Sequence, residues 1–340
     1  MTPERPPVTW PVRVGTPGGP TRWQARTPAW RSSSRGLYVP AEVDGTVPEQ
    51  RIVEAAAVLP EHGGVTGWGA LRWAGAKWFD GRGLDGRLVR PVTLVTSCDD
   101  IRPQRGIDVS AERLDPRDLV DLDGVRMTSP ARAVCFEMRY MPTLELAVVH
   151  LDMAARDDVV SIEEMREYAA RHRGWTGIPQ CRAAIPFASE NSWSSGEVLM
   201  RLLWTHRAGL PRPLSNVPVF DLAGRHIGTP DLFDPVVGVV GEYDGALHLA
   251  GAKRSRDLDR EELFRSHGLE YVVMLGHDGR DPRPFLARLT RAYERAVHRP
   301  PAPRSWTLAR PSYWPDTSTV AARRALPEEL RQRWLRPWAA

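Results

Sequence analysis

The segment TPDLFDPVVGVVGEYDGALH, residues 229–248, decides the fold and contains several carboxylates and a histidine. It has two apolar runs separated by Asp234-Pro235, a turn signal that predicts a β-hairpin. Glu242 and Asp244 follow the second run and are two residues apart. Because side chains alternate along a strand, we expect both carboxylates on one face of the hairpin.

A further carboxylate, Asp231, stands at the start of the same segment. If residues 234–238 close the hairpin, Asp231 lies opposite Glu242. Like charges directly opposed across two strands cost stability unless a cation neutralises them. A divalent cation meets that need, and oxygen-only ligands suit Mg²⁺ or Mn²⁺. The segment therefore predicts a small metal site of the kind that hydrolyses phosphodiesters.

Helices and strands alternate on both sides of this hairpin. Ser194 or Ser195 can cap a helix, and Gly268 stands in the usual helix-stop position. The expected elements are a helix over 196–208, strands over 217–221, over 226–233 and from 236, a helix over 257–267, a strand over 270–275 and a helix over 283–298. The order is α-β-β-β-α-β-α, with the three strands as an antiparallel meander.

This order, with the acidic Glu197 on the first helix, resembles the PD-(D/E)xK nuclease fold. The residues that carry the resemblance are Asp231, Glu242-Tyr-Asp244-Gly245-Ala-Leu-His248, Asp257-Leu-Asp-Arg260 and Gly268. They are most similar to the very-short-patch-repair-like endonuclease domains found at the C-terminus of uncharacterised actinobacterial proteins. The resemblance covers residues 190–298 and implies a restriction-endonuclease-like αβββαβα core with a central mixed sheet.

The resemblance also implies roles for individual residues. Asp231 and Glu242 would be metal ligands, and Asp244 would be a third ligand or the base that orients the attacking water. His248 would act as general base or acid, because a histidine exchanges its proton near neutral pH. Glu197 would complete the catalytic site from the helix.

One position departs from the superfamily pattern. Asp244 replaces the lysine that gives the superfamily its name, so Lys253 or Arg256 would have to supply the positive charge. Lys253, Arg254 and Arg256 follow the acidic segment and are candidates for holding a DNA backbone. The same basic stretch can equally be an ordinary solvated loop.

Several of these residues also have simpler interpretations. A Glu-x-Asp pair at a strand end is often a solvated strand terminus, and a single histidine such as His248 is often a surface residue. Glu197 and Arg201, four residues apart, would form an ion pair on one helix. Asp257 and Arg260 would be a helix-start charge and a structural pair.

Composition sets broad limits on the function. The chain has 340 residues, which is comfortable for two domains. With 46 basic and 42 acidic residues the net charge is +4, so bulk charge alone does not predict nucleic-acid binding. Three cysteines without a C-x-x-C spacing predict neither a disulfide framework nor a thiolate zinc site. No apolar run approaches a membrane span, so we expect a cytoplasmic protein.

The front half of the chain predicts a separate α+β unit. Its matching segments, VTGWGALRWA from Val65 and GVRMTSPARAV from Gly124, resemble the abortive-infection antitoxin-like region found before such nuclease-like domains. The expected organisation is a Pro/Gly/Arg-rich irregular lead over 1–45, an antitoxin-like α+β domain over 46–150, a helical linker over 151–189, the endonuclease-like domain over 190–298 and a Pro/Arg/Trp-rich tail over 299–340.

Two functions follow from this organisation. The first is a divalent-metal-dependent DNA endonuclease that uses Asp231, Glu242 and Asp244, assisted by Glu197 and His248. The second is a non-catalytic DNA-binding or antitoxin-type regulator, with a toxin or another protein as partner, that keeps the nuclease-like fold as a scaffold.

Overall fold

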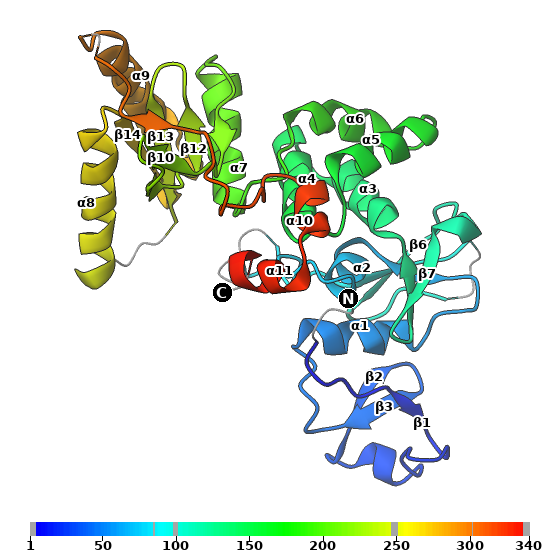
Figure 1. The fold of residues 1–340 in the computed structure, drawn as a ribbon. Helices are drawn as coiled ribbons and strands as arrows, with labels where there is room; N and C mark the ends of the chain where they lie inside the picture. The colour runs from blue at the N-terminus through cyan, green and yellow to red at the C-terminus, as the bar shows by residue number, and fades with distance from the viewer. Residues whose placement is uncertain (1–4, 84–85, 98–100, 246–250, 301, 336–340) are drawn as a thin grey trace. The chain divides into compact units, whose positions relative to one another are not determined.

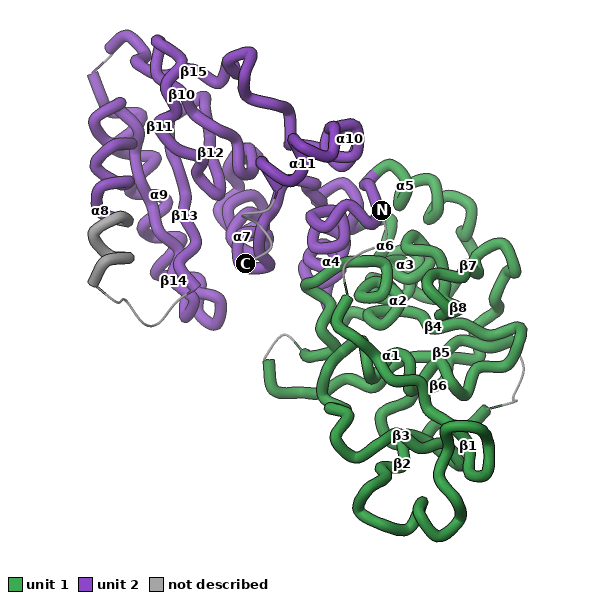
Figure 2. The backbone as a smooth tube through the Cα atoms, turned by 60° about the horizontal axis from the view of Figure 1, so that its bottom comes forward, with its two compact units in different colours: residues 1–142, 163–183 green, residues 143–162, 184–340 purple. Residues whose placement is uncertain are grey.

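The computed structural model describes residues 5–83, 86–97, 101–245, 251–300 and 302–335. In the helix over 251–266, side chains are described from residue 258 onward. The chain is a mixed α/β protein (Figure 1), as expected. It divides into two compact units, unit 1 with residues 1–142 and 163–183, and unit 2 with residues 143–162 and 184–340 (Figure 2). The chain therefore passes from one unit to the other three times.

Unit 1 contains a five-stranded sheet in the order β6-β5-β4-β8-β7, covered by helices. Pairs β4·β8 and β5·β6 are parallel, and the other two are antiparallel. The strands are β4 (Gly64–Thr66), β5 (Val92–Val95), β6 (Ile107–Ser110), β7 (Leu119–Leu122) and β8 (Val125–Thr128), and the helical elements here are α1 (Pro48–Ala56), α2 (Gly67–Trp73), η2 (Pro116–Asp118) and α3 (Pro130–Tyr140).

The sequence predicts two helix caps in unit 1, Thr66 and, before Pro130, Ser129, and their outcomes differ. Ser129 caps α3, with its Oγ accepting from the Arg132 amide at 3.4 Å and Pro130 following it. Thr66 does not cap α2 with its side chain, which instead bonds the Thr128 hydroxyl at 3.0 Å. The segment before α2 is the strand β4, whose small residues pack within the sheet.

The first forty residues are more regular than the expected irregular lead. They include a three-stranded antiparallel sheet in the order β1-β3-β2, built by β1 (Val12–Arg13), β2 (Trp30–Ser34) and β3 (Leu37–Pro40), with η1 (Gln24–Arg26) between strands. The Arg35-Gly36 turn, with Gly36 at φ +77°, joins β2 to β3. The alternation of apolar residues in β3, with Leu37 and Val39 buried, is the signal that the abundant prolines and glycines obscured.

The helices expected as a linker do not form a separate segment. They are α4 (Leu144–Arg156), which belongs to unit 2, and α5 (Ile162–Arg171) and α6 (Ile178–Ala184), which belong to unit 1; η3 (Ile185–Phe187) follows in unit 2. Asp152 on α4 pairs with Arg201 in unit 2 at 2.6 Å, and both side chains are fully buried. This pair helps to make α4 part of unit 2.

Unit 2 is built on a four-stranded mixed sheet in the order β14-β13-β12-β9. Its strands are β9 (Leu214–Ser215), β12 (Leu232–Asp234), β13 (Val239–Asp244) and β14 (Glu270–Leu275); β13·β14 is parallel and the other pairs are antiparallel. Around the sheet lie α7 (Ser195–Leu202), continued as the π-helix η4 (Leu203–Arg207), α8 (Gly251–Ser266), η5 (Gly276–Gly279) and α9 (Arg283–Val297). The predictions for β14 and α9 are confirmed, and α8 begins six residues earlier than predicted.

The expected strand over 226–233 is wrong as one element. It is interrupted at Thr229-Pro230-Asp231, because proline has no N–H for a ladder. The first part, β11 (His226–Gly228), pairs with β10 (Val219–Asp221) in a separate small sheet, which β15 (Trp306–Thr307) from the tail completes. Only the second part, β12, enters the main sheet.

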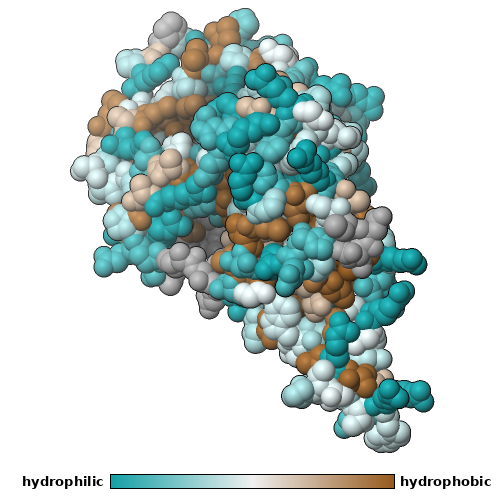
Figure 3. Space-filling model, turned by 90° about the vertical axis from the view of Figure 1, so that its right-hand side faces the viewer, coloured by the Kyte–Doolittle hydropathy of each residue, from teal (hydrophilic) through white to brown (hydrophobic). Residues whose placement is uncertain are grey.

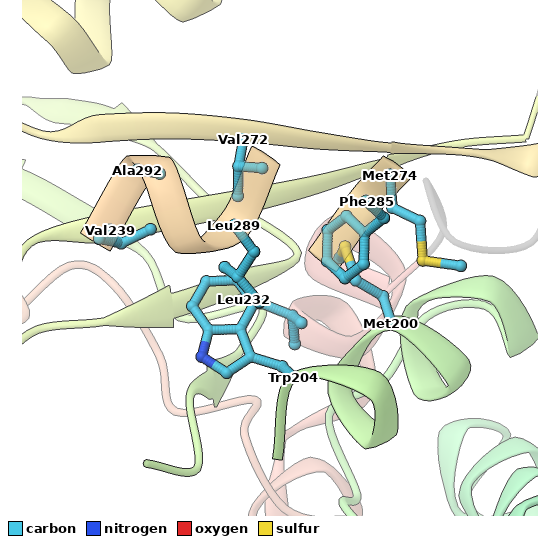
Figure 4. Packing of buried hydrophobic residues seen from close by; sticks show 9 residues of the cluster. All are labelled: Met200, Trp204, Leu232, Val239, Val272, Met274, Phe285, Leu289 and Ala292. Atoms are coloured by element: carbon cyan, nitrogen blue, oxygen red, sulfur yellow. The ribbon is translucent and has the colours of Figure 1, made fainter. Parts of the chain in front are cut away.

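The two faces of the main sheet have separate hydrophobic cores. Figure 4 shows the core against α7 and α9, formed by Met200, Trp204, Leu232, Val239, Val272, Met274, Phe285, Leu289 and Ala292. The other core contains Phe233, Val240, Phe264 of α8 and Trp306 of β15. The tail contains α10 (Val320–Ala325) and α11 (Glu328–Leu335).

The surface is mainly polar. Figure 3 shows one face of the molecule, where hydrophilic side chains predominate and hydrophobic ones form scattered patches. Among the helices in the described ranges, none has the length and apolar character needed to cross a bilayer.

Candidate functional site

The hairpin of β12 and β13 has the predicted register. Leu232 pairs with Gly241 and Asp234 with Val239, so the next position places Asp231 across from Glu242. The Asp234 carboxylate closes the turn by accepting from the Val236 amide at 2.9 Å. The opposition of two carboxylates, expected from the sequence, is therefore present.

Both carboxylates lie on the sheet face that α8 covers. Phe233 and Val240 belong to the core on that face, whereas Leu232 and Tyr243 pack on the opposite one. Side chains two residues apart on a strand point to the same face. Asp231 therefore shares the face of Phe233, and Glu242 shares the face of Val240. Asp244, at the end of β13, shares this face and is partly exposed.

Asp231 is held by the backbone of the neighbouring strand. Its Oδ2 accepts from the Tyr243 amide at 2.7 Å. Burial raises the pKa of the Asp231 carboxyl well above its usual range, and the charges of Glu242 and Glu197 raise it further. Asp231 is thus close enough to both carboxylates for their charges to disfavour its ionised form.

Glu197 comes from the first turn of α7, which Ser194 caps by accepting from the Glu197 amide at 3.2 Å. Its Oε2 accepts from the Trp193 amide at 2.8 Å and from Asn216 Nδ2 at 2.7 Å. Burial raises the pKa of Glu197. The predicted ion pair with Arg201 is wrong, because Arg201 instead bonds the buried Asp152.

Asn216 links two of the acidic positions, and the sequence did not single it out. Its side-chain amide donates to Glu197, and its backbone N–H donates to the Asp231 carbonyl at 3.0 Å. Asn216 is buried and adopts a left-handed backbone conformation, φ +46°, which asparagine tolerates better than most residues. Ser215-Asn216 before Val-Pro was the available sequence signal of a tight turn.

Arg260 supplies a positive charge to the acidic pair. Its Nε and Nη2 donate to Glu242 Oε1 at 3.0 and 2.8 Å, and Nη2 also donates to the Thr229 carbonyl. Asp257 is not a helix-start charge as predicted, because α8 begins at Gly251. The Asp257 side chain lies outside the described residues, so its predicted pairing with Arg260 stays a prediction. One partner of Arg260 is Glu242 on β13, which the spacing of residues within the helix could not predict.

Two further titratable groups surround this ion pair. Burial raises the pKa of Tyr271 on β14, and the charges of Glu242 and Asp231 add to the shift. Burial and the charge of Arg260 lower the pKa of His226, whose Nε2 lies 3.0 Å from Thr229 Oγ1. Neither residue had been assigned to the site from the sequence.

Several predicted site residues cannot be placed. His248 lies outside the described residues, as do the side chains of Lys253, Arg254 and Arg256. Their proposed roles as proton carrier and DNA-backbone contacts stay predictions.

The donor set partly fits a divalent cation. Asp231, Glu242 and Asp244 offer only oxygen atoms on one face of the sheet, as Mg²⁺ and Mn²⁺ prefer. Across the residues that the structure describes, however, no three acidic, histidine or cysteine side chains stand together as ready-made ligands. Glu242 instead uses one oxygen for Arg260. A cation would have to compete with this guanidinium.

Comparisons with known proteins give distant relatives only. Two uncharacterized proteins of Mycobacterium tuberculosis, MT2308 of strain CDC 1551 / Oshkosh and Rv2248 of strain ATCC 25618 / H37Rv, are each 29% identical to this chain over 152 residues. The match covers 44% of this chain and 55% of each relative, so the chain spans about half the length of the curated relatives it matches. No family model matches the chain. No solved structure matches it either.

Proposed function

We propose that the chain is a divalent-metal-dependent DNA endonuclease with a restriction-endonuclease-like core in unit 2. The observation that carries the proposal is the pair of opposed carboxylates, Asp231 and Glu242, with Glu197 close enough to raise the pKa of Asp231. Carboxylates gathered around Asp231 cost stability unless a cation neutralises them, and a divalent cation meets that need. The strands of the main sheet and the helices beside it follow the order α7-β9-β12-β13-α8-β14-α9, which supports the same interpretation.

In this proposal Asp231 and Glu242 would hold Mg²⁺ or Mn²⁺, with Asp244 as a third ligand. The bound metal supplies a water of lowered pKa and offsets charge on the phosphate. Asn216 and the Trp193 amide hold the Glu197 carboxylate at the edge of the cluster. Arg260, released from Glu242 by the metal, would take the place of the missing superfamily lysine beside the phosphodiester.

A second function has an observation of its own. The Arg260–Glu242 ion pair already neutralises one carboxylate, so the cluster can persist without metal. In that case unit 2 is a non-catalytic scaffold of a DNA-binding or antitoxin-type regulator.

Metal binding and DNA cleavage together test the proposal. We would measure the melting temperature in Mg²⁺, Mn²⁺ and EDTA, and the nicking of supercoiled and single-stranded DNA, for wild type and Asp231→Asn/Glu242→Gln. The wild type should be stabilised by metal and should nick DNA, and the double variant should do neither. Asp281→Asn, which changes an exposed carboxylate paired with Arg283, is the control and should behave as wild type.

Arg260→Gln distinguishes the two functions. If a metal competes with Arg260 for Glu242, this variant should bind Mn²⁺ more tightly than wild type while cleaving DNA more slowly. If the ion pair is only structural, the variant should lose stability that Mn²⁺ does not restore. Absence of both metal stabilisation and cleavage in the wild type would refute the nuclease proposal.

A further inference from the structure

A cluster of arginine and aromatic side chains in unit 1 has no part in the proposed nuclease chemistry. Arg132 and Arg139 lie two turns apart on α3, and both side chains are almost completely buried. Trp175, from the loop between α5 and α6, lies under both guanidinium groups, at 4.4 Å from Arg132 and 4.9 Å from Arg139. Two cations are therefore held against one aromatic wall.

One carboxylate, Glu112, bridges the two arginines. Arg132 Nη2 donates to Glu112 Oε2 at 2.8 Å, and Arg139 Nη2 donates to Oε1 at 2.7 Å. The Tyr140 hydroxyl donates to the same carboxylate. Two guanidinium groups and a phenol are the donors that proteins use for anions with several oxygens.

The donors exceed the acceptors at this cluster. Nε and Nη1 of Arg132 and Nε of Arg139 are buried and have no hydrogen-bond acceptor. Buried N–H groups without an acceptor are costly, more so on a charged group. The carboxylate that both arginines share carries one negative charge against their two positive charges.

An open cavity of about 260 Å³ adjoins the cluster. It is lined by Glu112, Arg113, Arg139, Tyr140, Gly174, Trp175 and Thr176. Glu112 reaches the arginines from an irregular stretch after β6, where its neighbours Ala111 and Arg113 are exposed. Its carboxylate can therefore leave without moving a buried neighbour.

We propose that this cluster binds phosphate, as the free ion or as the monoester of a small molecule, in competition with the Glu112 side chain. A phosphate dianion offers more acceptors than a carboxylate and balances both arginine charges. The cavity lets the rest of a monoester extend along Trp175 and Tyr140. Glu112 acts as the internal occupant that keeps the arginines paired while no ligand is bound.

Removing the internal occupant tests the proposal. Glu112→Gln keeps the shape of the side chain but not its charge, so phosphate should bind this variant at least about tenfold more tightly than the wild type. Binding is measured by isothermal titration with inorganic phosphate and, separately, with adenosine monophosphate, at constant ionic strength set by chloride. Binding of the free ion alone or of both ligands distinguishes the two sources of the phosphate group.

Two further variants serve as a loss-of-binding test and as a control. Arg139→Lys should weaken phosphate binding in the Glu112→Gln background, because a single ammonium cannot replace the guanidinium fork. Arg117→Gln, which removes an exposed cation that pairs with Asp115, should leave binding unchanged. If folded Glu112→Gln protein shows no saturable phosphate binding, the cluster is a structural ion-pair network and the proposal is wrong. If that variant does not fold, Glu112→Ser is titrated in the same way and judged by the same outcome.

Discussion

At the scale of single residues, the most informative group is the Asp231 carboxyl. It is buried and lies near two other carboxylates, which together raise its pKa. A carboxyl group whose pKa is higher in the folded than in the unfolded protein destabilises the fold when it is ionised. This destabilisation is present above the folded pKa and disappears as the pH falls to the unfolded value.

Replacing Asp231 should therefore stabilise the metal-free protein in a pH-dependent way. In EDTA, Asp231→Asn should raise the melting temperature at pH about 8 and should change it little at pH about 4, where wild-type Asp231 is protonated. The asparagine Oδ1 can still accept from the Tyr243 amide. Differential scanning calorimetry of both proteins checks this, and an equal difference at both pH values would contradict it.

At the scale of elements, the contact between α7 and β13 positions the site. Gly196, the second residue of α7, lies directly against the Tyr243 ring, and an added Cβ there would approach a ring carbon to 2.0 Å. The same helix carries Glu197, and the same strand carries Glu242. Only glycine lets this helix approach the strand so closely.

Gly196→Ala should push α7 away from β13. Overpacking of this kind costs about 1–3 kcal/mol of unfolding free energy, which urea denaturation would measure. Gly279→Ala is the control, because an added Cβ at Gly279 meets nothing within 4 Å. If both variants unfold at the same urea concentration, the close approach is not a constraint on α7.

At the scale of the whole chain, the C-terminal tail returns to unit 2 and is part of its structure. Trp306 of β15 packs edge-on against Phe233, with ring centroids 5.1 Å apart. Arg323 of α10 is buried, and its Nε donates to Asp158 Oδ1 at 2.7 Å while Nη2 donates to the Ala155 carbonyl at 2.7 Å. The tail thereby fastens the end of α4 to the rest of the unit.

Arg323→Ala should lower the unfolding free energy by about 3–5 kcal/mol, because it leaves the largely buried Asp158 without this partner. Arg310→Ala breaks an exposed pair with Asp316 in the same tail and should cost no more than about 1 kcal/mol. Urea denaturation measures both values. In limited proteolysis, the tail of Arg323→Ala should be cut earlier than the tail of Arg310→Ala. Equal stability of the two variants would show that the tail is not anchored by Arg323.

Elements with local signals were predictable from the sequence. The turn at Asp234-Pro235, the β-prone run Glu270–Leu275 and the helix Arg283–Val297 each depend on neighbouring residues, and each lies where the sequence places it. The opposition of Asp231 and Glu242 follows from the same hairpin, because turn length sets the register.

The tertiary structure alone decided which partners the charged side chains find. Arg260 of α8 bonds Glu242 of β13, and Arg201 of α7 bonds Asp152 of α4. Likewise, β11 leaves the main sheet for a small one that the distant β15 completes. These contacts join residues far apart in the chain. The free energy of burial and pairing outweighs local preference there, and sequence spacing does not predict the partners.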